Sequence, residues 1–325
     1  MPPEPSYSYL GPPGTFTEAA LAQVESAAGK PWRPVNNIGE ALDDVVSGTS
    51  IAAMLAIENT VEGGVAAVLD ALASIPDLRI VAEHLVPVRF ALLVRPGVRL
   101  DAVRSIAAHP VAYAQCRRWL HEHVRDHVQL PAASNIQAAQ FLADHEGDLA
   151  QAAIAPPSAA ERFGLETAAG DIGDNPNAVT RFVLVARAGS MPTAASTGAD
   201  KTSLVADLPS DRAGALLELL EQFATRGVNL SLLHSRPIGD ELGRYRFVID
   251  LDGHLDDERV AEALLGVRRF SPRVLFLGSY PRADRRPVGP AAAHDDRVYA
   301  DARAWLQSLP ARVPGPDASA GRPST

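Results

Sequence analysis

The stretch IAAMLAIENTVEGGV, residues 51–65, decides the class of fold. Its first seven residues are apolar and predict a buried strand. Three polar side chains, Glu58, Asn59 and Thr60, follow directly, and two glycines then permit a tight turn into a helix. A ligand site in an α/β protein usually lies where a buried strand ends and a helix begins. In a purely structural alternative, Asn59 and Thr60 only cap the next helix.

Outward from this stretch, short apolar runs alternate with amphipathic segments between residues 6 and 187. This alternation favours an α/β architecture with largely parallel sheets. We predict strands at Tyr7–Leu10, Ile51–Ile57, Ile80–Val94, Ser105–Ala108, Ala152–Ala155 and Phe182–Val185. We predict helices at Thr15–Ala28, Gly39–Ser47, Val65–Ser74, Pro110–His123, Asn135–His145 and Ser158–Phe163.

The C-terminal part has a different pattern. Residues 188–200 have linker composition. Residues 201–281 read strand-helix-strand-strand-helix-strand, the order of a ferredoxin-like domain, with Asp211 expected to cap its first helix. Residues 282–325 form a tail rich in Pro, Ala and Arg, in which 296–309 predict one short amphipathic helix and the last dozen residues predict disorder.

Composition excludes several classes of function. The formal net charge is −9 and no basic cluster is present, which argues against nucleic-acid binding. The single cysteine, Cys116, excludes an internal disulfide and a cysteine-based zinc cluster. The N-terminus lacks a signal-peptide pattern, and no apolar run has the length of a membrane span. These observations predict a cytoplasmic protein without a membrane segment.

Familiar catalytic motifs are absent, since no nucleophile elbow and no Walker-type phosphate loop occur. The turn GPPGTF, residues 11–16, offers backbone N–H groups that suit a carboxylate, although it can equally be a simple strand-to-helix turn. Thr180-Arg181 places a hydroxyl and a guanidinium at a strand edge, a pair that suits an acidic substrate. His109 stands at a predicted helix start. It is a candidate site residue, and the alternative is that it caps the helix or packs against it.

A metal site is not expected. His121, His123 and His127 are spaced so that they point to different sides of one helix, and a solvated helix face is the better interpretation.

Together these segments closely resemble prephenate dehydratase with a C-terminal regulatory ACT domain. The resemblance covers roughly residues 6–284, with motif order and spacing preserved. The matching stretches are YLGPPGTFTEAA, AIENTVEGGV, HPVAYAQCRRWL, SNIQAAQFLAD, AAIAPPSAAERFGLE, NAVTRFVLV, GALLELL, NLSLLHSRP and LGSYPRA.

The resemblance implies decarboxylative dehydration of prephenate to phenylpyruvate in phenylalanine biosynthesis. Aromatisation drives the reaction, so no cofactor and no metal are expected. Thr180 would donate a hydrogen bond to the departing hydroxyl, and Glu58 would orient the polar lining. The remaining residues implied for the site are Asn59, Thr60 and Gln115 as catalytic lining, and Arg181, Phe182, His109, Gly14, Thr15 and Gly64 as substrate contacts, with Phe182 as either pocket wall or core.

The family fold implies two lobes like those of periplasmic binding proteins, with the site in the cleft between them. The chain would cross between lobes near residue 85 and return near residue 176. The ACT domain would bind L-phenylalanine at a subunit interface of a homodimer or homotetramer. Its effector motifs here are Gly214, Ala215 and Leu216, and Leu233, His234, Ser235, Arg236 and Pro237. Without an N-terminal chorismate mutase bundle, the enzyme would be monofunctional.

Four positions depart from the family pattern. Ala56 replaces proline, Thr60 replaces serine and Val111 replaces glutamine near the expected pocket. His234 replaces the glutamate before Ser-Arg-Pro, which predicts a weakened or altered response to phenylalanine. Three alternatives stay open: a prephenate decarboxylase, which retention of Thr180 disfavours, an arogenate dehydratase, and a non-catalytic amino-acid sensor.

Overall fold

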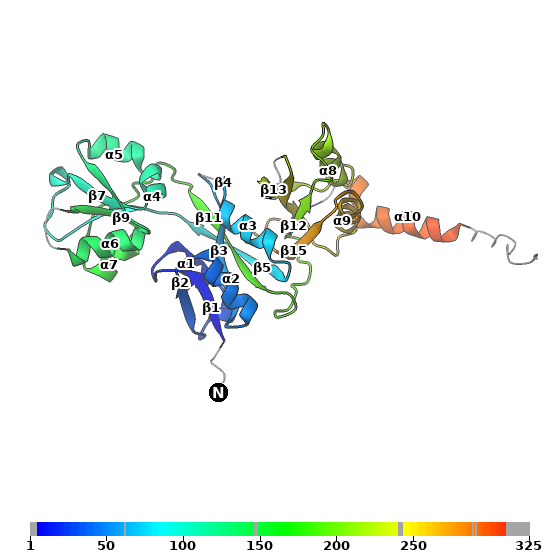
Figure 1. The fold of residues 1–325 in the computed structure, drawn as a ribbon, viewed down its shortest axis with the longest axis horizontal. Helices are drawn as coiled ribbons and strands as arrows, with labels where there is room; N and C mark the ends of the chain where they lie inside the picture. The colour runs from blue at the N-terminus through cyan, green and yellow to red at the C-terminus, as the bar shows by residue number, and fades with distance from the viewer. Residues whose placement is uncertain are drawn as a thin grey trace, which may run out of the picture.

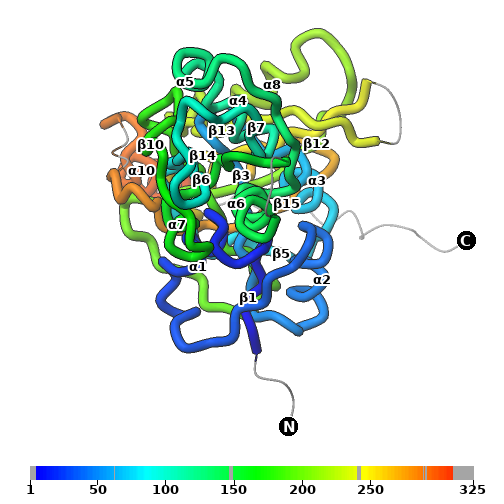
Figure 2. The backbone as a smooth tube through the Cα atoms, turned by 90° about the vertical axis from the view of Figure 1, so that its left-hand side faces the viewer, coloured from blue at the N-terminus to red at the C-terminus, as the bar shows by residue number. Residues whose placement is uncertain are grey.

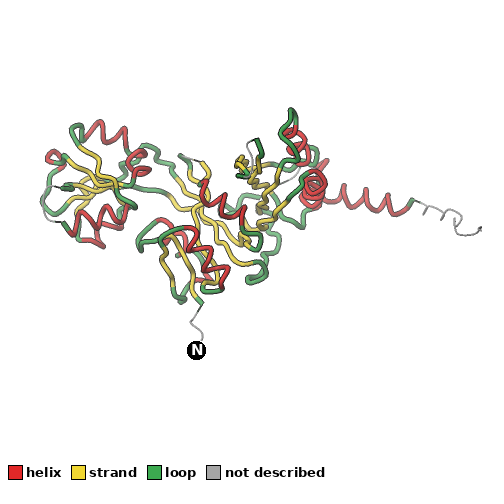
Figure 3. The backbone as a smooth tube through the Cα atoms, viewed as in Figure 1, coloured by secondary structure: helices red, strands yellow, loops and turns green. Residues whose placement is uncertain are grey.

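The computed structural model describes residues 5–61, 63–145, 149–239, 243–287, 289 and 291–309. Within these residues, the strands form three sheets, one in each of two N-terminal lobes and one in a C-terminal domain (Figure 1). Helices cover both faces of the sheets in the lobes (Figure 3). The predicted α/β class, with two lobes and a ferredoxin-like domain, is confirmed.

The sheet of the first lobe has the order β2-β1-β3-β11-β5, and β4 pairs with β3. β1 runs parallel to β2 and β3, whereas β11 runs antiparallel to β3 and β5. The sheet is therefore mixed rather than largely parallel, because β11 re-enters it from the second lobe. The bounds are β1 (Ser6–Leu10), β2 (Trp32–Val35), β3 (Ser50–Asn59), β4 (Gly63–Gly64), β5 (Leu78–Pro87) and β11 (Val179–Arg187).

Each face of this sheet has its own core. On one face, buried Tyr9 and Met54 pack with Leu21 of α1. On the other face, Leu55 packs with α2 and α3. The helical elements are α1 (Phe16–Leu21), the 3₁₀ turn η1 (Glu25–Ala27), α2 (Ile38–Ser47) and α3 (Ala66–Ser74).

The second lobe has a sheet of order β10-β6-β9-β7-β8, with α4 and α5 on one core and α6 and α7 on the other. β5 and β11 carry the two connections between the lobes (Figure 1). The strands are β6 (Ala91–Val94), β7 (Ser105–Ala108), β8 (Val128–Pro131), β9 (Ala152–Ala155) and β10 (Glu166–Ala169). The helices are η2 (Leu100–Ala102), α4 (Pro110–Gln115), α5 (Arg117–His123), α6 (Asn135–Asp144) and α7 (Ser158–Phe163).

The C-terminal domain has an antiparallel sheet of order β13-β14-β12-β15. α8 and α9 cover one face, and the other face shares a core with the first lobe, where Val205, Leu232 and Tyr280 join the cluster of Leu55. The bounds are β12 (Asp200–Asp207), α8 (Ala215–Ala224), β13 (Leu230–Pro237), β14 (Tyr245–Asp252), α9 (Glu258–Phe270) and β15 (Val274–Pro281).

Two predicted elements are each split in the structure. The strand expected over 80–94 ends at Pro87, which has no N–H for a ladder, and the chain there leaves the first lobe. The helix expected over 110–123 breaks at Cys116. The reason is distant in sequence: the carboxylate of Asp174 accepts hydrogen bonds from the N–H groups of Arg118 and Trp119 and so caps α5.

Two predicted helix ends are wrong. The first helix ends at Leu21, because Val24 and Ala27 beyond it turn inward and join the core around Tyr9. Asp211 does not cap α8, which begins after Gly214, a residue in the left-handed region with φ of +85°. The strands β2, β4, β8 and β10 were not predicted.

After β15, the turn η3 (Ala292–His294) leads into α10 (Asp296–Ser308), which confirms the helix predicted in the tail and projects from the C-terminal domain (Figure 1). The predicted disorder of the last dozen residues lies outside the described part of the chain. Figure 2 shows the molecule from the side of the second lobe, with α6 and α7 toward the viewer. Among the described residues, no helix has the length and apolar character that a membrane crossing requires.

His84 on β5 should make stability sensitive to acid. Its ring nitrogen Nε2 is buried without a hydrogen-bond partner among the described residues, and burial lowers the pKa of His84 against the opposing charge of Glu83. The folded state therefore binds fewer protons than the unfolded state, and stability falls as pH drops below the unfolded pKa of about 6.5. We expect the urea midpoint to fall between about pH 7.5 and about pH 5.5, and to fall less in His84→Gln. The same acid sensitivity in the variant would contradict this assignment.

Candidate active site

The ends of β3 and β11 bring the predicted catalytic hydroxyl and amide together. Thr180 lies directly opposite Asn59, and Arg181 lies opposite Glu58. Directly opposed residues of an antiparallel pair have Cβ atoms about 4.5–5.5 Å apart. Thr180 and Asn59 are therefore neighbours, although they lie far apart in the sequence.

Asn59 and Thr60 fix the loop that follows β3. The N–H of Thr60 donates to the carbonyl of Val179 at 3.1 Å, and the Thr60 hydroxyl oxygen accepts from the Val179 N–H at 3.1 Å. Asn59 Oδ1 accepts from the N–H of Val61 at 2.9 Å. Neither side chain caps α3, whose N-cap is Val65, so the helix-cap alternative is wrong. The loop is instead tied to the residue before Thr180.

Strand alternation separates Thr180 from Arg181, since successive side chains point to opposite faces of a sheet. Phe182 shares the face of Thr180 and is buried in the core with Tyr9. Phe16, the first residue of α1, packs against the same core. Thr180 thus faces the side of the sheet that α1 covers. Phe182 belongs to the core, which is one of the two alternatives left open for it, and not to the lining of a pocket.

Arg181 points the other way, into the interface with the C-terminal domain. It is 5% exposed, and its guanidinium donates to Glu83 at 2.6 Å and to Asp250 at 2.6 Å. Burial alone would lower the pKa of Arg181, but the negative charges of Asp250 and Glu83 raise it well above its usual value, so the group stays charged. Its predicted role as the cation for substrate carboxylates is therefore wrong in this arrangement, because buried protein carboxylates already hold it.

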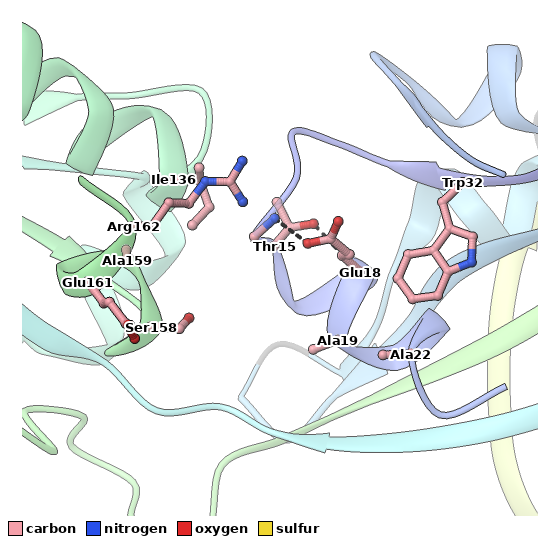
Figure 4. A pocket seen from close by; sticks show the side chains of 11 residues that line it. Thr15, Glu18, Ala19, Ala22, Trp32, Ile136, Ser158, Ala159, Glu161 and Arg162 are labelled. Atoms are coloured by element: carbon pink, nitrogen blue, oxygen red, sulfur yellow. Dashed lines mark hydrogen bonds between the residues drawn. The ribbon is translucent and has the colours of Figure 1, made fainter. Parts of the chain in front are cut away.

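Two neighbouring cavities lie between the lobes and share Thr15 and Ile136. The smaller, of about 320 Å³, contains His109 of the second lobe opposite Gly11 of the first. The larger, of about 590 Å³, lies between α1 and α7 (Figure 4). Both volumes lie within the range usual for small-molecule sites. We refer to them together as the interlobe cleft.

The turn between β1 and α1 forms the first-lobe wall of this cleft. Gly14 adopts φ of +97°, and Thr15 caps α1 by accepting from the N–H of Glu18 at 3.4 Å. Glu18 itself accepts from the Gly14 N–H and from the Tyr9 hydroxyl. Gly14 and Thr15 therefore line the cleft, where the sequence placed them.

Arg162 of α7 reaches across the cleft toward this turn (Figure 4). A Cβ added to Gly14 would lie 3.1 Å from Arg162 Nη1, so the guanidinium lies against the backbone of the turn. Among the described residues that line the two cavities, it is the one arginine, and no lysine joins it. Sequence analysis missed Arg162 because an isolated arginine on a six-residue helix carries no pattern.

Of the two predicted site residues next to or in α4, His109 lines the cleft and Gln115 does not. His109 is the N-cap of α4, with Nδ1 accepting from the Val111 N–H at 3.3 Å, and it also lines the cleft. Gln115 is the last residue of α4, and its carbonyl accepts from the N–H of Asp174 at 2.7 Å. Gln115 does not line either cavity. Glu58, Asn59 and Thr180 also lie outside the two linings, at the adjacent edge of the first-lobe sheet.

The predicted effector strand contacts the first lobe. His234 Nε2 accepts from the N–H of Gly64 at 3.2 Å, and Arg236 forms a bidentate pair with Asp70 of α3. Gly64, predicted to contact substrate, therefore uses its N–H within the protein, and a side chain there would collide with His234. The alternate residues of β13 point away from the first lobe and are exposed, namely Leu233, Ser235 and Pro237. In the other predicted effector segment, Gly214 precedes α8, Ala215 is buried and Leu216 is exposed.

No group of three or more His, Cys, Asp or Glu residues in the described part of the chain could hold a metal ion. Cys116 is buried, and burial raises the pKa of its thiol to about 12, with a contribution from Asp174. A thiolate nucleophile at this position is excluded at neutral pH.

Comparison with known proteins shows the family of the chain. A family model described as prephenate dehydratase matches residues 7–190, and a model described as ACT domain matches residues 202–269. A prephenate dehydratase from Mycobacterium bovis is 42% identical over 315 residues, which cover 94% of each chain.

Two solved structures are informative. A prephenate dehydratase from Arthrobacter aurescens in complex with L-Phe is 51% identical, with a TM-score of 0.86 over 93% of this chain and 98% of its own. A quorum quenching acylase, GqqA, is 29% identical, with a TM-score of 0.73 over 87% of this chain and 100% of its own. The family models, the curated relative and the first structure agree, and the chain belongs to the prephenate dehydratase family, with a C-terminal ACT domain.

Proposed function

We propose that the interlobe cleft, together with the paired residues of β3 and β11 at the adjacent edge of the first-lobe sheet, converts prephenate to phenylpyruvate, carbon dioxide and water. The observation that carries the proposal is the pairing of Thr180 with Asn59 on the sheet next to the cleft. In this reaction the bond to the ring carboxylate breaks and its electron pair enters the ring, while the ring C–O bond breaks. The departing hydroxide accepts a hydrogen bond from Thr180 and becomes water by taking one proton, which comes from solvent with the Thr180 hydroxyl as relay. No covalent nucleophile takes part.

The chemistry requires that a dianion be held in orientation, and Arg162 is suited to this task. Arg181 cannot contribute, because its guanidinium is buried among protein carboxylates. Arg162 faces the cleft beside the turn that contains Gly14 and Thr15. A planar guanidinium is well matched to a carboxylate. We infer that Arg162 binds one carboxylate of prephenate.

Replacement of Arg162 by methionine is therefore expected to raise KM for prephenate about 10- to 100-fold. A charge-assisted hydrogen bond contributes about 1.5–3 kcal/mol. Arg162→Lys should lose less, since it keeps the charge. The exposed Arg117 on α5, which lines neither cavity, provides a matched control as Arg117→Met. Steady-state kinetics checks this, and an unchanged KM in Arg162→Met would remove Arg162 from the site.

We further infer that L-phenylalanine regulates the enzyme through the ACT domain. The support is the Arthrobacter structure with bound L-Phe and the presence of both predicted motifs at the expected elements, the start of α8 and strand β13. A homodimer or homotetramer built through the ACT domains would cover exposed Leu216, Leu217 and Leu233. Light scattering on the purified protein measures the assembly, and a monomer would contradict it.

The choice of substrate is tested by comparing kcat/KM for prephenate and arogenate, each with and without L-phenylalanine. We expect prephenate to be preferred and L-phenylalanine to inhibit. A preference for arogenate would change the substrate assignment, and binding of L-phenylalanine without turnover of either compound would leave a sensor. The acylase relative shares the fold at lower identity than the dehydratase from Arthrobacter, so no observation here favours acyl transfer.

A further inference from the structure

Arg181 is the centre of a buried polar cluster that joins the two parts of the molecule. Its Nε donates to Glu83 of β5 at 2.6 Å, its Nη1 to Asp250 of β14 at 2.6 Å and its Nη2 to the Tyr280 hydroxyl of β15 at 2.8 Å. Glu83 is 6% exposed, and Asp250 and Tyr280 are 0% exposed. All three nitrogens of the guanidinium are thus bound, and two of their partners come from the ACT domain.

Further bonds fix the partners themselves. Ser203 of β12 lies 2.6 Å from the Tyr280 hydroxyl and donates to Asp250. Glu83 also accepts from Lys201 at 3.2 Å, so the cluster balances buried negative charges with buried positive charges. Fully satisfied networks of this kind hold their members in one arrangement.

The cluster reaches the candidate active site through one nitrogen atom. Arg181 Nη1 is shared between Asp250 of the ACT domain at 2.6 Å and Glu58 of β3 at 3.4 Å. Glu58 is the residue before Asn59, and Arg181 is the residue after Thr180. A movement of Asp250 relative to the first lobe therefore changes the contact that Nη1 makes with Glu58, and both strand ends that carry the site are attached to it.

We propose that Arg181 is a positioning residue, through which Asp250 and Tyr280 of the ACT domain set the arrangement of Thr180 and Glu58. The inference rests on the proposed function and adds to it a physical route for regulation. An effector shifts the ACT sheet between two arrangements only if it binds them with different affinity, and the shared nitrogen converts such a shift into a change at the site. Arg181 does not touch substrate in this account.

The test uses the full chain with Tyr280→Phe, which removes one hydroxyl, and Asp250→Asn, which removes one charge and keeps the shape. Ser279→Ala is the matched control, because Ser279 is a buried hydroxyl on β15 that bonds Thr202 and does not contact Arg181. We expect both cluster variants to lower kcat for prephenate about 5- to 30-fold with KM changed less than about threefold, as coupling within one network predicts. The control should keep the wild-type kcat.

The concentration of L-phenylalanine that gives half-inhibition supplies a readout that simple loss of stability does not move. We expect it to shift several-fold in both cluster variants and to stay unchanged in Ser279→Ala. A double-mutant cycle adds Glu58→Gln to Asp250→Asn, and competition for Nη1 predicts that their effects on kcat are not additive.

The outcomes separate cleanly. Turnover by the wild type with cluster variants that match the control in kcat and in inhibition would overturn the inference and leave the proposed function standing. No turnover of prephenate by the wild type would overturn the proposed function, and this inference with it. Should Asp250→Asn fail to fold, Tyr280→Phe alone decides, since it retains every charge of the cluster.

Discussion

Thr180→Ala is expected to lower kcat for prephenate by about 10²- to 10⁴-fold while KM changes little. A positioned proton donor contributes an effect of that size to the step in which it acts. Thr180 stands at the start of β11 opposite Asn59, and its strand is tied at Val179 to Thr60, so the backbone that carries the hydroxyl is held in place before substrate arrives. The hydrogen bond from Thr180 stabilises the departing hydroxyl, which develops charge only in the transition state. Its loss therefore lowers kcat and leaves KM nearly unchanged.

Thr180→Ser is the matched control. It retains the hydroxyl and is expected to keep most of the activity, whereas Thr180→Val keeps the shape, lacks the hydroxyl and should behave as the alanine variant does. Steady-state measurement of phenylpyruvate with each variant separates the roles of hydroxyl and shape. Equal activity of the valine variant and the wild type would remove Thr180 from the mechanism.

Arg181→Met is expected to reduce the free energy of unfolding by about 3–5 kcal/mol, since removing one partner of a buried ion pair leaves the other charge uncompensated. Here two carboxylates, Glu83 and Asp250, would be left in the interface between the first lobe and the ACT domain. Lys201 would still pair with Glu83, but the carboxylate of Asp250 would keep, among the described residues, only its bond from Ser203.

Urea unfolding of Arg181→Met measures this loss directly. The exposed Arg187 at the far end of the same strand is the matched control, and Arg187→Met should change stability by less than about 0.5 kcal/mol. A loss in Arg181→Met no larger than that in the control would show that the buried cluster does not stabilise the fold.

Sequence patterns located the site better than they assigned its parts. The apolar run that ends in Glu58-Asn59-Thr60 predicted a strand with functional residues at its end, and the motif with Thr180 predicted a second one. Their pairing across β3 and β11 could not be predicted, because strand register between distant segments depends on the tertiary fold. The helix-cap alternative for Asn59 and Thr60 failed for the same reason, since their bonds go to neighbouring loop residues and to β11.

Arg181 and Arg162 show that a local sequence pattern does not predict contacts that depend on the tertiary fold. A Thr-Arg pair before a strand suggested that both side chains serve the site, but strand alternation sends Arg181 to the opposite face, where the ACT domain surrounds it. Arg162 lies in the matching stretch AAIAPPSAAERFGLE, but nothing there singled it out, because its relation to Gly14 exists only once two lobes are placed side by side. Likewise the break at Cys116 depends on Asp174, which arrives from a distant segment.

The central claim is tested most directly by incubating the purified protein with prephenate at neutral pH and following the ring protons by NMR. The account predicts loss of the diene signals and growth of the aromatic signals of phenylpyruvate, one product molecule for each prephenate consumed, and almost none with Thr180→Ala. Consumption of prephenate to a product that keeps its diene, or no consumption at all, would contradict it.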